Sequence, residues 1–418
     1  MLYQFSEDIE GVEKTFETLQ KENGVIVFGT GNCGALVIAA LKKAHIKIIA
    51  LADNNDARWG EKYYGFEVLP PSNWQTFDKS IPVIVASDLN FPYIKRQLKY
   101  LGFAKILDCD FVFAKLDLEL SECEVNWSKE KIKQKIDTYM FSVLAQKQKD
   151  KYLKVNGIDL VLTEKCSLKC KDCSNLMQLY AKPIDEDFEE LIASIDTFLT
   201  TVDYVHEIRL IGGEPLMYKK IDLVIEHLLT YNNYDRINIY TNGTIVPNEH
   251  KMDVFENANV FFDISDYGKH SRNLQRLIDE LEKRNIRYDS KFVTSWQDCG
   301  RIVKTNRTNE ENKAIFGNCC ENQGLTILHG KLYLCPFSAH ATNLKAIPLS
   351  PTDIVDLEAQ DELQLKDQIK RLYFNTEFLE ACRACNGRHP NVSQVEAAVQ
   401  VKKPLEYERV TETNNVYF

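Results

Sequence analysis

Residues 166–173 read Cys166-Ser167-Leu168-Lys169-Cys170-Lys171-Asp172-Cys173 and place three cysteines at the spacing C-x3-C-x2-C. Four thiolates close the coordination of a metal ion or cluster, whereas three thiolates on a cubane [4Fe-4S] cluster leave one iron without a protein ligand. An iron with an open position can hold a small molecule and pass it an electron. We therefore expect a reactive site at this loop, with a zinc site short of one ligand as the alternative.

A second motif follows the cysteine loop after a helical stretch. An apolar-rich strand at residues 207–211 ends in Gly212-Gly213-Glu214-Pro215. Glycine avoids Cβ clashes where the backbone approaches a ligand, and a carboxylate accepts hydrogen bonds from an ammonium group. Together, the two motifs resemble those of the radical S-adenosylmethionine (SAM) enzymes. The resemblance implies a SAM-binding [4Fe-4S] cluster on Cys166, Cys170 and Cys173, with the G-G-E-P turn against the methionine end of SAM.

The resemblance also implies a reaction. A reduced cluster gives SAM one electron, and the resulting 5′-deoxyadenosyl radical takes a hydrogen atom from an unactivated C–H bond, which is oxidoreductase-like chemistry. The resemblance implies that Thr241, Asn242 and Ser265 contact SAM, with ordinary polar residues at strand ends as the alternative. Cys299 is a candidate hydrogen-atom donor, like a thiol of some radical SAM epimerases, with a small buried side chain as the alternative.

Composition narrows the function classes. The chain has 418 residues, enough for two or three domains, with 44% hydrophobic and 27% charged residues. Its net charge of −10 argues against a nucleic-acid partner. We expect no signal peptide and no membrane span, and therefore a cytoplasmic protein. The 12 cysteines are mostly clustered after residue 165, which is typical of metal ligands in a cytosolic enzyme.

Residues 1–125 show the pattern of a Rossmann-like domain. A short apolar strand at 25–28 leads into Gly29-Thr30-Gly31-Asn32-Cys33-Gly34, a helix follows, and a second strand ends at Asp53. We expect Gly29, Gly31, Gly34 and Asp53 to bind a nucleotide. The region resembles the N-terminal nucleotide-sugar-binding domain of sugar acyltransferases. The alternative is a domain of this fold that binds only a protein partner.

Repeated βα units indicate a parallel sheet in residues 155–312, after a helical connector at 126–154. In the radical SAM family this region is a partial (β/α)6 barrel, and the motifs fall at the carboxyl ends of its strands, where function is expected.

Residues 313–392 hold five further cysteines and resemble the small α+β twitch, or SPASM-like, domain that some radical SAM enzymes carry. The resemblance implies an auxiliary [4Fe-4S] cluster, with a structural zinc as the alternative. Cys319 and Cys320 both have the required spacing, so the ligand set is one or both of these with Cys335, Cys382 and Cys385. Residues 393–418 carry no ligand pattern and are expected to form a tail that frays at 414–418.

Two substrate classes stay open. A sugar, cyclitol or nucleotide-linked sugar is expected from the Rossmann-like domain and from a twitch arrangement like that of a radical SAM aminocyclitol dehydrogenase. The alternative is a peptide or protein substrate. Either reaction needs a reductant such as flavodoxin or ferredoxin. A hypothesis from another class is a non-catalytic Fe–S sensor or scaffold, which would keep the cysteines but not need Glu214.

Overall fold

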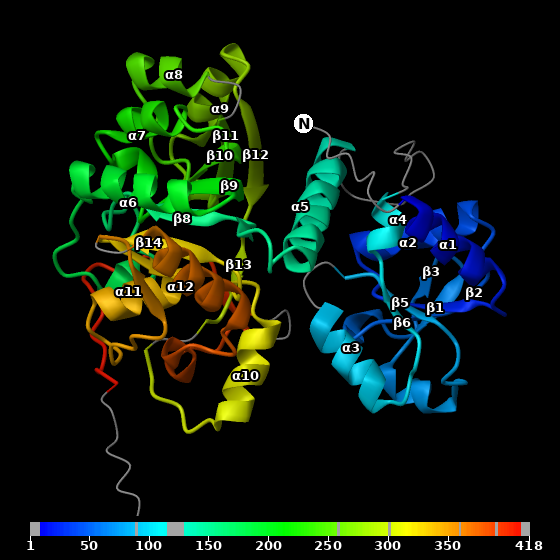
Figure 1. The fold of residues 1–418 in the computed structure, drawn as a ribbon. Coiled ribbons are helices and arrows are strands. Elements are labelled where there is room, and N and C mark those ends of the chain that lie inside the picture. Colours follow the sequence, from blue (N-terminus) through cyan, green and yellow to red (C-terminus); the bar gives the residue numbers. More distant parts are fainter. Residues whose placement is uncertain are drawn as a thin grey trace, which may run out of the picture. The chain divides into compact units, whose positions relative to one another are not determined.

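The structure is a computed structural model that describes residues 9–87, 91–114, 129–256, 260–299, 302–358, 361–388 and 392–410. The chain divides into two compact units, Met1–Leu144 and Ala145–Phe418 (Figure 1). The tail end expected to fray, residues 414–418, lies outside the described residues.

The first unit contains one six-stranded sheet and helices. Its elements are α1 (Ile9–Gln20), β1 (Val25–Phe28), α2 (Asn32–Lys43), β2 (Ile48–Ala52), β3 (Lys62–Tyr63), β4 (Phe66–Leu69), β5 (Val83–Val85), α3 (Phe91–Tyr100), β6 (Ile106–Asp108), α4 (Asp110–Ala114) and most of α5 (Lys129–Lys147). The strand order is β3-β4-β2-β1-β5-β6, and all neighbours are parallel except β3 and β4.

The central strand β1 contributes side chains to two hydrophobic clusters, one on each face of the sheet. All four of its residues are buried, as expected for a parallel strand covered on both faces. Val25 and Val27 join one hydrophobic cluster, whereas Ile26 and Phe28 join another, because successive side chains point to opposite faces of a sheet.

The second unit begins with strands and helices that alternate regularly. Its first elements are β7 (Lys154–Val155), β8 (Ile158–Val161), α6 (Phe188–Thr201), β9 (Tyr204–Ile211), α7 (Ile221–Leu228), β10 (Tyr234–Thr241), α8 (Glu249–Phe255), β11 (Val260–Asp266), α9 (Leu274–Lys283), β12 (Arg287–Phe292) and β13 (Ser295–Gln297). The remaining elements are α10 (Asn309–Asn318), β14 (Leu325–Leu328), β15 (Lys331–Tyr333), α11 (Pro336–Asn343), β16 (Ile354–Asp356), α12 (Glu362–Asn375) and β17 (Gln394–Glu396).

Its main sheet has the order β12-β11-β10-β9-β8-β14-β15-β16. The strands from β12 to β14 are parallel, and β15 and β16 are antiparallel additions. The mixed α/β architecture with parallel sheets is therefore confirmed. The carboxyl ends of parallel strands meet at one edge, so the loops after β8, β9, β10 and β11 lie close together.

Strand β14 comes from the region expected to form a separate C-terminal domain, yet it pairs in parallel with β8. Its four residues are all buried, so both faces of the strand are covered, and β15 pairs with its other edge. The division at residue 312 and the partial barrel remain predictions.

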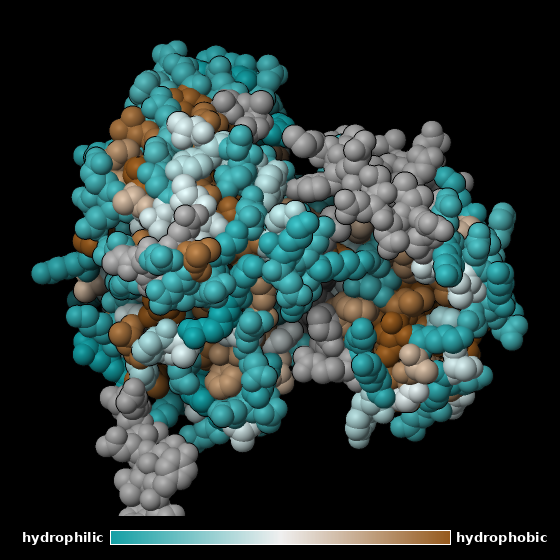
Figure 2. Space-filling view, viewed as in Figure 1, coloured by the Kyte–Doolittle hydropathy of each residue, from teal (hydrophilic) through white to brown (hydrophobic). Residues whose placement is uncertain are grey.

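No helix among the described residues is long and apolar enough to cross a bilayer. In the view of Figure 2, hydrophilic residues cover most of the visible surface, and hydrophobic residues occur in separate patches.

Candidate active site

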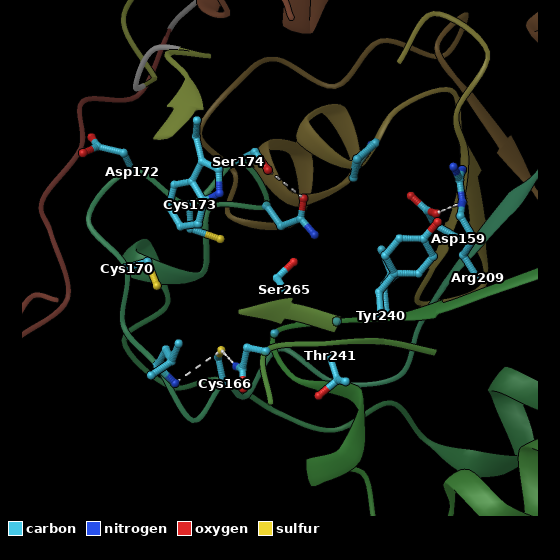
Figure 3. A pocket seen from close by; sticks show the side chains of 18 of the residues that line it. Asp159, Cys166, Cys170, Asp172, Cys173, Ser174, Arg209, Tyr240, Thr241 and Ser265 are labelled. Carbon is cyan, nitrogen blue, oxygen red and sulfur yellow. Dashed lines mark hydrogen bonds and ion pairs between the residues drawn. The ribbon is translucent and has the colours of Figure 1, made fainter. Parts of the chain in front are cut away.

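The predicted SAM-site residues meet at the carboxyl edge of the main sheet. The cysteine loop follows β8, the glycines follow β9, Thr241 ends β10, and Ser265 lies near the end of β11. One cavity of about 510 Å³ is lined by residues that were not predicted and by eight of the predicted ones, namely Cys166, Cys170, Cys173, Gly212, Gly213, Thr241, Asn242 and Ser265. Glu214 and Pro215 are not among its lining residues. In Figure 3 the three cysteines lie on one side of this cavity and Asp159, Arg209 and Tyr240 on the other, with Ser265 between them.

The two glycines of the turn are required by close packing. Gly212 has a φ of 157°, and a Cβ there would lie 2.4 Å from the Thr163 carbonyl oxygen. A Cβ on Gly213 would lie 2.3 Å from the Lys165 carbonyl oxygen. The Gly213 and Glu214 amides donate to the carbonyls of Thr163 (2.8 Å) and Lys165 (2.9 Å). The turn is therefore hydrogen-bonded directly to the base of the cysteine loop.

Glu214 is fully buried and holds neighbouring backbone. One carboxylate oxygen accepts from the Thr241 hydroxyl (2.8 Å) and the Leu216 amide (3.2 Å), and the other accepts from the Asn242 amide (2.9 Å). Burial raises the pKa of this carboxyl to about 7, against the lowering effect of these donors. A carboxylate has about four acceptor sites, and these three donors leave about one of them for the ammonium group of SAM. The contact between Glu214 and SAM stays a prediction.

Each cysteine of the two predicted groups, Cys320 excepted, accepts a hydrogen bond from an N–H group. The donors are the Leu168 amide to Cys166, the Gln400 side chain to Cys170, the Asn175 and Met177 amides to Cys173, the Glu321 and Arg388 amides to Cys319, the Ser338 amide to Cys335, the Leu379 amide to Cys382 and the Gly387 amide to Cys385. Such donors stabilise negative charge on sulfur and are one means by which proteins tune iron–sulfur clusters.

The N–H donors around the three thiols indicate whether the cysteine loop can hold a cluster. Burial raises the pKa of Cys170 to about 12 and also raises the pKa of Cys166 and Cys173, so the isolated thiols stay protonated at neutral pH. A bound metal deprotonates them, and the N–H groups then face thiolates. Among the described residues, no group of three or more His, Cys, Asp or Glu side chains is arranged around a single metal ion. A cubane does not need that arrangement, because each thiolate binds a different iron. The loop therefore fits a three-cysteine cluster.

Two ion pairs that the sequence did not reveal also line the cavity. Asp159 on β8 and Arg209 on β9 are register partners, and their side chains lie 2.6 Å apart. Glu321 and Arg388 form a second pair at 2.5 Å. Burial raises the pKa of Asp159 to about 6, against the lowering effect of Arg209. The four charges balance, so these two pairs make the cavity lining polar and add little net charge to it.

Cys299 is buried and is not among the side chains that line this cavity. Its thiol lies 3.6 Å from the Gln297 carbonyl oxygen and accepts from the Arg388 Nε at 3.4 Å. Both partners do line the cavity. The proposed hydrogen-atom donor therefore lies behind the cavity wall, and its role stays a prediction.

The second cysteine group forms a small apolar pocket of its own. Cys319, Cys335, Cys382 and Cys385 line it with Phe316, Phe337 and Leu379 among others. The Cys320 thiol instead lies 3.8 Å from Glu321 Oε1, and Cys320 is exposed. The structure thus brings four of the five predicted ligands together and separates Cys320 from them.

In the first unit, the glycine turn has the geometry that its sequence predicts. Gly29 has a φ of 107°, and a Cβ on Gly34 would lie 2.2 Å from the Gly29 carbonyl oxygen, whereas a Cβ on Gly31 would meet nothing within 4 Å. Asp53 accepts from the Thr30 amide and hydroxyl, both at 2.7 Å, and from the Asn55 amide at 2.9 Å. Its carboxylate therefore holds the turn itself, and nucleotide binding there stays a prediction.

Comparisons with known proteins agree with this site. Residues 160–265 match the Radical SAM superfamily, and residues 21–106 match a family described as C2185-like, N-terminal. GTP 3′,8-cyclase of Desulforamulus reducens is 30% identical over 96 residues, which are 22% of this chain and 28% of that protein. Molybdenum cofactor biosynthesis protein 1 of Dictyostelium discoideum is 32% identical over 101 residues, which are 24% of this chain and 15% of that protein. The matches thus span less than a third of these relatives.

Among solved structures, anSMEcpe with bound AdoMet and the Cp18Cys peptide is 12% identical, with a TM-score of 0.38 over 61% of this chain and 93% of that chain. BtrN in complex with AdoMet and 2-DOIA is 15% identical, with a TM-score of 0.36 over 56% and 93%. The family match spans β8 to β11, the strands whose ends carry the cysteine loop and the G-G-E-P turn. The chain therefore carries a domain of the Radical SAM superfamily at residues 160–265, which indicates an enzyme.

Proposed function

We propose that this chain cleaves SAM at a [4Fe-4S] cluster held by Cys166, Cys170 and Cys173, and removes a hydrogen atom from a small hydroxylated molecule. The substrate class is a sugar, a cyclitol or a nucleotide-linked sugar, and the outcome is oxidation, epimerisation or a related change. The observation that carries this proposal is the shared cavity, which the three cysteines and two partly buried ion pairs line together.

When bound, the reduced cluster supplies the electron that cleaves SAM, and the adenosyl fragment supplies the group that takes hydrogen. The chain's own residues position these groups. Glu214 fixes the Thr241–Asn242 peptide, and the Asn242 side chain donates to the Ser167 hydroxyl (3.1 Å) and lies 3.7 Å from Cys166 Sγ. The end of β10 is thereby joined to both the G-G-E-P turn and the cysteine loop.

The Asp159–Arg209 and Glu321–Arg388 ion pairs favour a substrate whose reacting end carries no net charge. Arg209 and Arg388 are each neutralised by a carboxylate, so neither is free to bind a phosphate. Carboxylates accept hydrogen bonds and guanidinium groups donate them, and adjacent hydroxyls of a polyol can satisfy both. A nucleotide-linked sugar would place its phosphates away from this part of the cavity.

A second [4Fe-4S] cluster in the twitch-like region is part of the proposal. Cys319, Cys335, Cys382 and Cys385 share one pocket and each accepts an amide hydrogen bond, which favours Cys319 over Cys320 as the fourth ligand. Such a cluster would accept the second electron when an alcohol carbon is oxidised. A structural zinc at these thiols is the alternative, and metal analysis distinguishes the two.

The first unit is proposed to bind a nucleotide or nucleotide sugar. The order of its parallel strands, β4-β2-β1-β5-β6, supports this, because it is the order of a doubly wound nucleotide-binding sheet. Titration calorimetry of the full chain with UDP-glucose, and with the Gly31→Trp variant that fills the open turn, tests it. Saturable binding that the variant loses supports the proposal, and no binding contradicts it.

The experiment for the whole proposal measures hydrogen abstraction. The anaerobically reconstituted chain is reduced with dithionite, or with flavodoxin as the expected physiological reductant, and given SAM with fully deuterated glucose, myo-inositol, UDP-glucose, glucose 6-phosphate or peptides. Deuterium in 5′-deoxyadenosine from a neutral polyol or UDP-sugar supports the proposal. Deuterium from peptides alone supports the peptide-modifying alternative, and no 5′-deoxyadenosine at all supports a non-catalytic sensor.

One variant separates substrate binding from SAM cleavage. Asp159→Asn removes the ion-pair partner of Arg209, so we expect substrate-dependent deuterium transfer to fall at least tenfold while uncoupled SAM cleavage persists. Asp279→Asn is the matched control, because Asp279 lies exposed on α9 and bonds only locally to Gln275. Equal transfer by both variants would contradict the role given to the Asp159–Arg209 pair.

A further inference from the structure

The segment expected to be a tail runs along the cysteine loop. Strand β17 pairs antiparallel with β13. Beyond β17, the Lys171 amide donates to the Val399 carbonyl (2.7 Å) and the Val401 amide donates to the Lys169 carbonyl (2.8 Å). Cys170 and Gln400 form the antiparallel bridge between them. In Figure 3 part of this C-terminal segment is drawn in red-brown beside the loop that carries Cys170 and Asp172. The loop is therefore hydrogen-bonded to a segment from the far end of the described chain.

The Gln400 side chain uses all its hydrogen-bonding groups at this bridge. Its Oε1 accepts from the Lys169 amide (2.7 Å), and its Nε2 donates to the Ala398 carbonyl (2.7 Å) and to Cys170 Sγ (3.2 Å). The Lys169 amide can only donate and the Ala398 carbonyl can only accept. The side-chain amide therefore has one orientation that satisfies its partners, and this orientation directs an N–H group at the sulfur.

Cys170 differs in this respect from the other cysteines of the loop. Cys166 and Cys173 accept backbone amide hydrogens, which remain in every side-chain substitution except one to proline, and Cys166 has a longer contact with the Asn242 side-chain amide at 3.7 Å. For Cys170, the donor that the structure describes is the Gln400 side chain. The hydrogen bond that stabilises negative charge on the Cys170 sulfur thus comes from one side chain, that of Gln400, which can be substituted. Gln400 lies outside every motif of the sequence.

We propose that Gln400 is a positioning residue that tunes the cluster of the cysteine loop. Its N–H group stabilises the Cys170 thiolate, and more so when the cluster gains an electron and its negative charge rises. The reduction potential is therefore higher with Gln400 than without it. This inference rests on the proposed function only in requiring a cluster at the loop.

Two variants test it. Gln400→Leu removes the donor, and Gln400→Glu keeps the shape but directs an oxygen at the sulfur. Gln400 is exposed, so neither change opens a cavity in the core. Gln394→Leu is the matched control, because Gln394 is an exposed glutamine of the same segment whose partner is Ser295. The readout is a redox titration of the cluster's EPR signal that responds to SAM, which gives the midpoint potential. It is measured on the protein molecules of each variant that contain the cluster.

A hydrogen bond to a partly exposed thiolate contributes about 1 kcal/mol, so the reduced-to-oxidised ratio at a fixed potential should fall about fivefold in Gln400→Leu. That is a shift of about 40 mV to more negative potential, since tenfold is 59 mV for one electron. Gln400→Glu should shift further in the same direction, and Gln394→Leu should match the unaltered chain. Unchanged potentials in both Gln400 variants, or a rise in either, would overturn the inference. A loop in the unaltered chain that loads no cluster would instead overturn the proposed function.

Discussion

Adding one methyl group at Gly213 should separate the G-G-E-P turn from the cysteine loop. The Cβ of Gly213→Ala would lie 2.3 Å from the Lys165 carbonyl oxygen, 2.6 Å from the Lys165 carbonyl carbon and 2.8 Å from Cys166 Cβ. These are backbone atoms and the base of a ligand side chain, which cannot rotate away. Overpacking typically costs 1 to 3 kcal/mol, and the fixed obstacle places this variant at about 3 kcal/mol of lost unfolding free energy.

Urea unfolding of the cofactor-free chain measures this loss, and iron content after anaerobic reconstitution measures the effect on the loop. We expect Gly213→Ala to be destabilised by about 3 kcal/mol and to load less iron. Gly31→Ala is the control, because a Cβ there meets nothing within 4 Å. Wild-type stability and iron loading in Gly213→Ala would refute the close packing of turn and loop.

Three further predictions follow from the described contacts. Burial raises the pKa of Glu214 to about 7, so the protonated form stabilises the fold below pH 4.5. This contribution, about 3 kcal/mol of unfolding free energy, should be lost as the pH rises to 7. In urea unfolding of the cofactor-free chain, Glu214→Gln should remove this dependence of the unfolding free energy on pH. Hydrogen bonds to Glu164 and Glu186 raise the pKa of His329 to about 10, so its contribution is present below pH 6.5 and lost towards pH 10, and unfolding of His329→Gln should vary less over that range. A Cβ at Gly34 would lie 2.2 Å from a carbonyl oxygen, so Gly34→Ala should destabilise the first unit by about 3 kcal/mol, and wild-type stability in thermal unfolding would contradict this.

The sequence predicted the cysteine side of the cavity because motif residues follow buried strands directly. Parallel strands place their carboxyl ends at one edge, and the family resemblance then indicated Thr241 and Ser265 as candidates among the residues at that edge. The ion-pair side was missed because it depends on strand register. Asp159 and Arg209 pair only once β8 and β9 are aligned, although a charged residue within each apolar strand was a signal available in the sequence.

Contacts made by distant segments were equally hidden. Cys319 and Cys320 are adjacent, and only the turn after α10 decides which thiol faces the pocket with Cys335. Gln400 was placed in a tail because residues 393–418 carry no ligand pattern, and a hydrogen bond to a cysteine more than two hundred residues away leaves no periodic signal. Within the segment predicted to be a tail, described residues bond to the cysteine loop and to Ala346, which the sequence did not indicate.

The most direct test of the central claim is the formation of 5′-deoxyadenosine by the anaerobically reconstituted, dithionite-reduced chain given SAM alone, compared with Cys173→Ser. The proposed cluster predicts 5′-deoxyadenosine and methionine in equal amounts from the unaltered chain and none from the variant. Zinc without iron at the loop, or equal product from both proteins, would contradict the assignment of Cys166, Cys170 and Cys173.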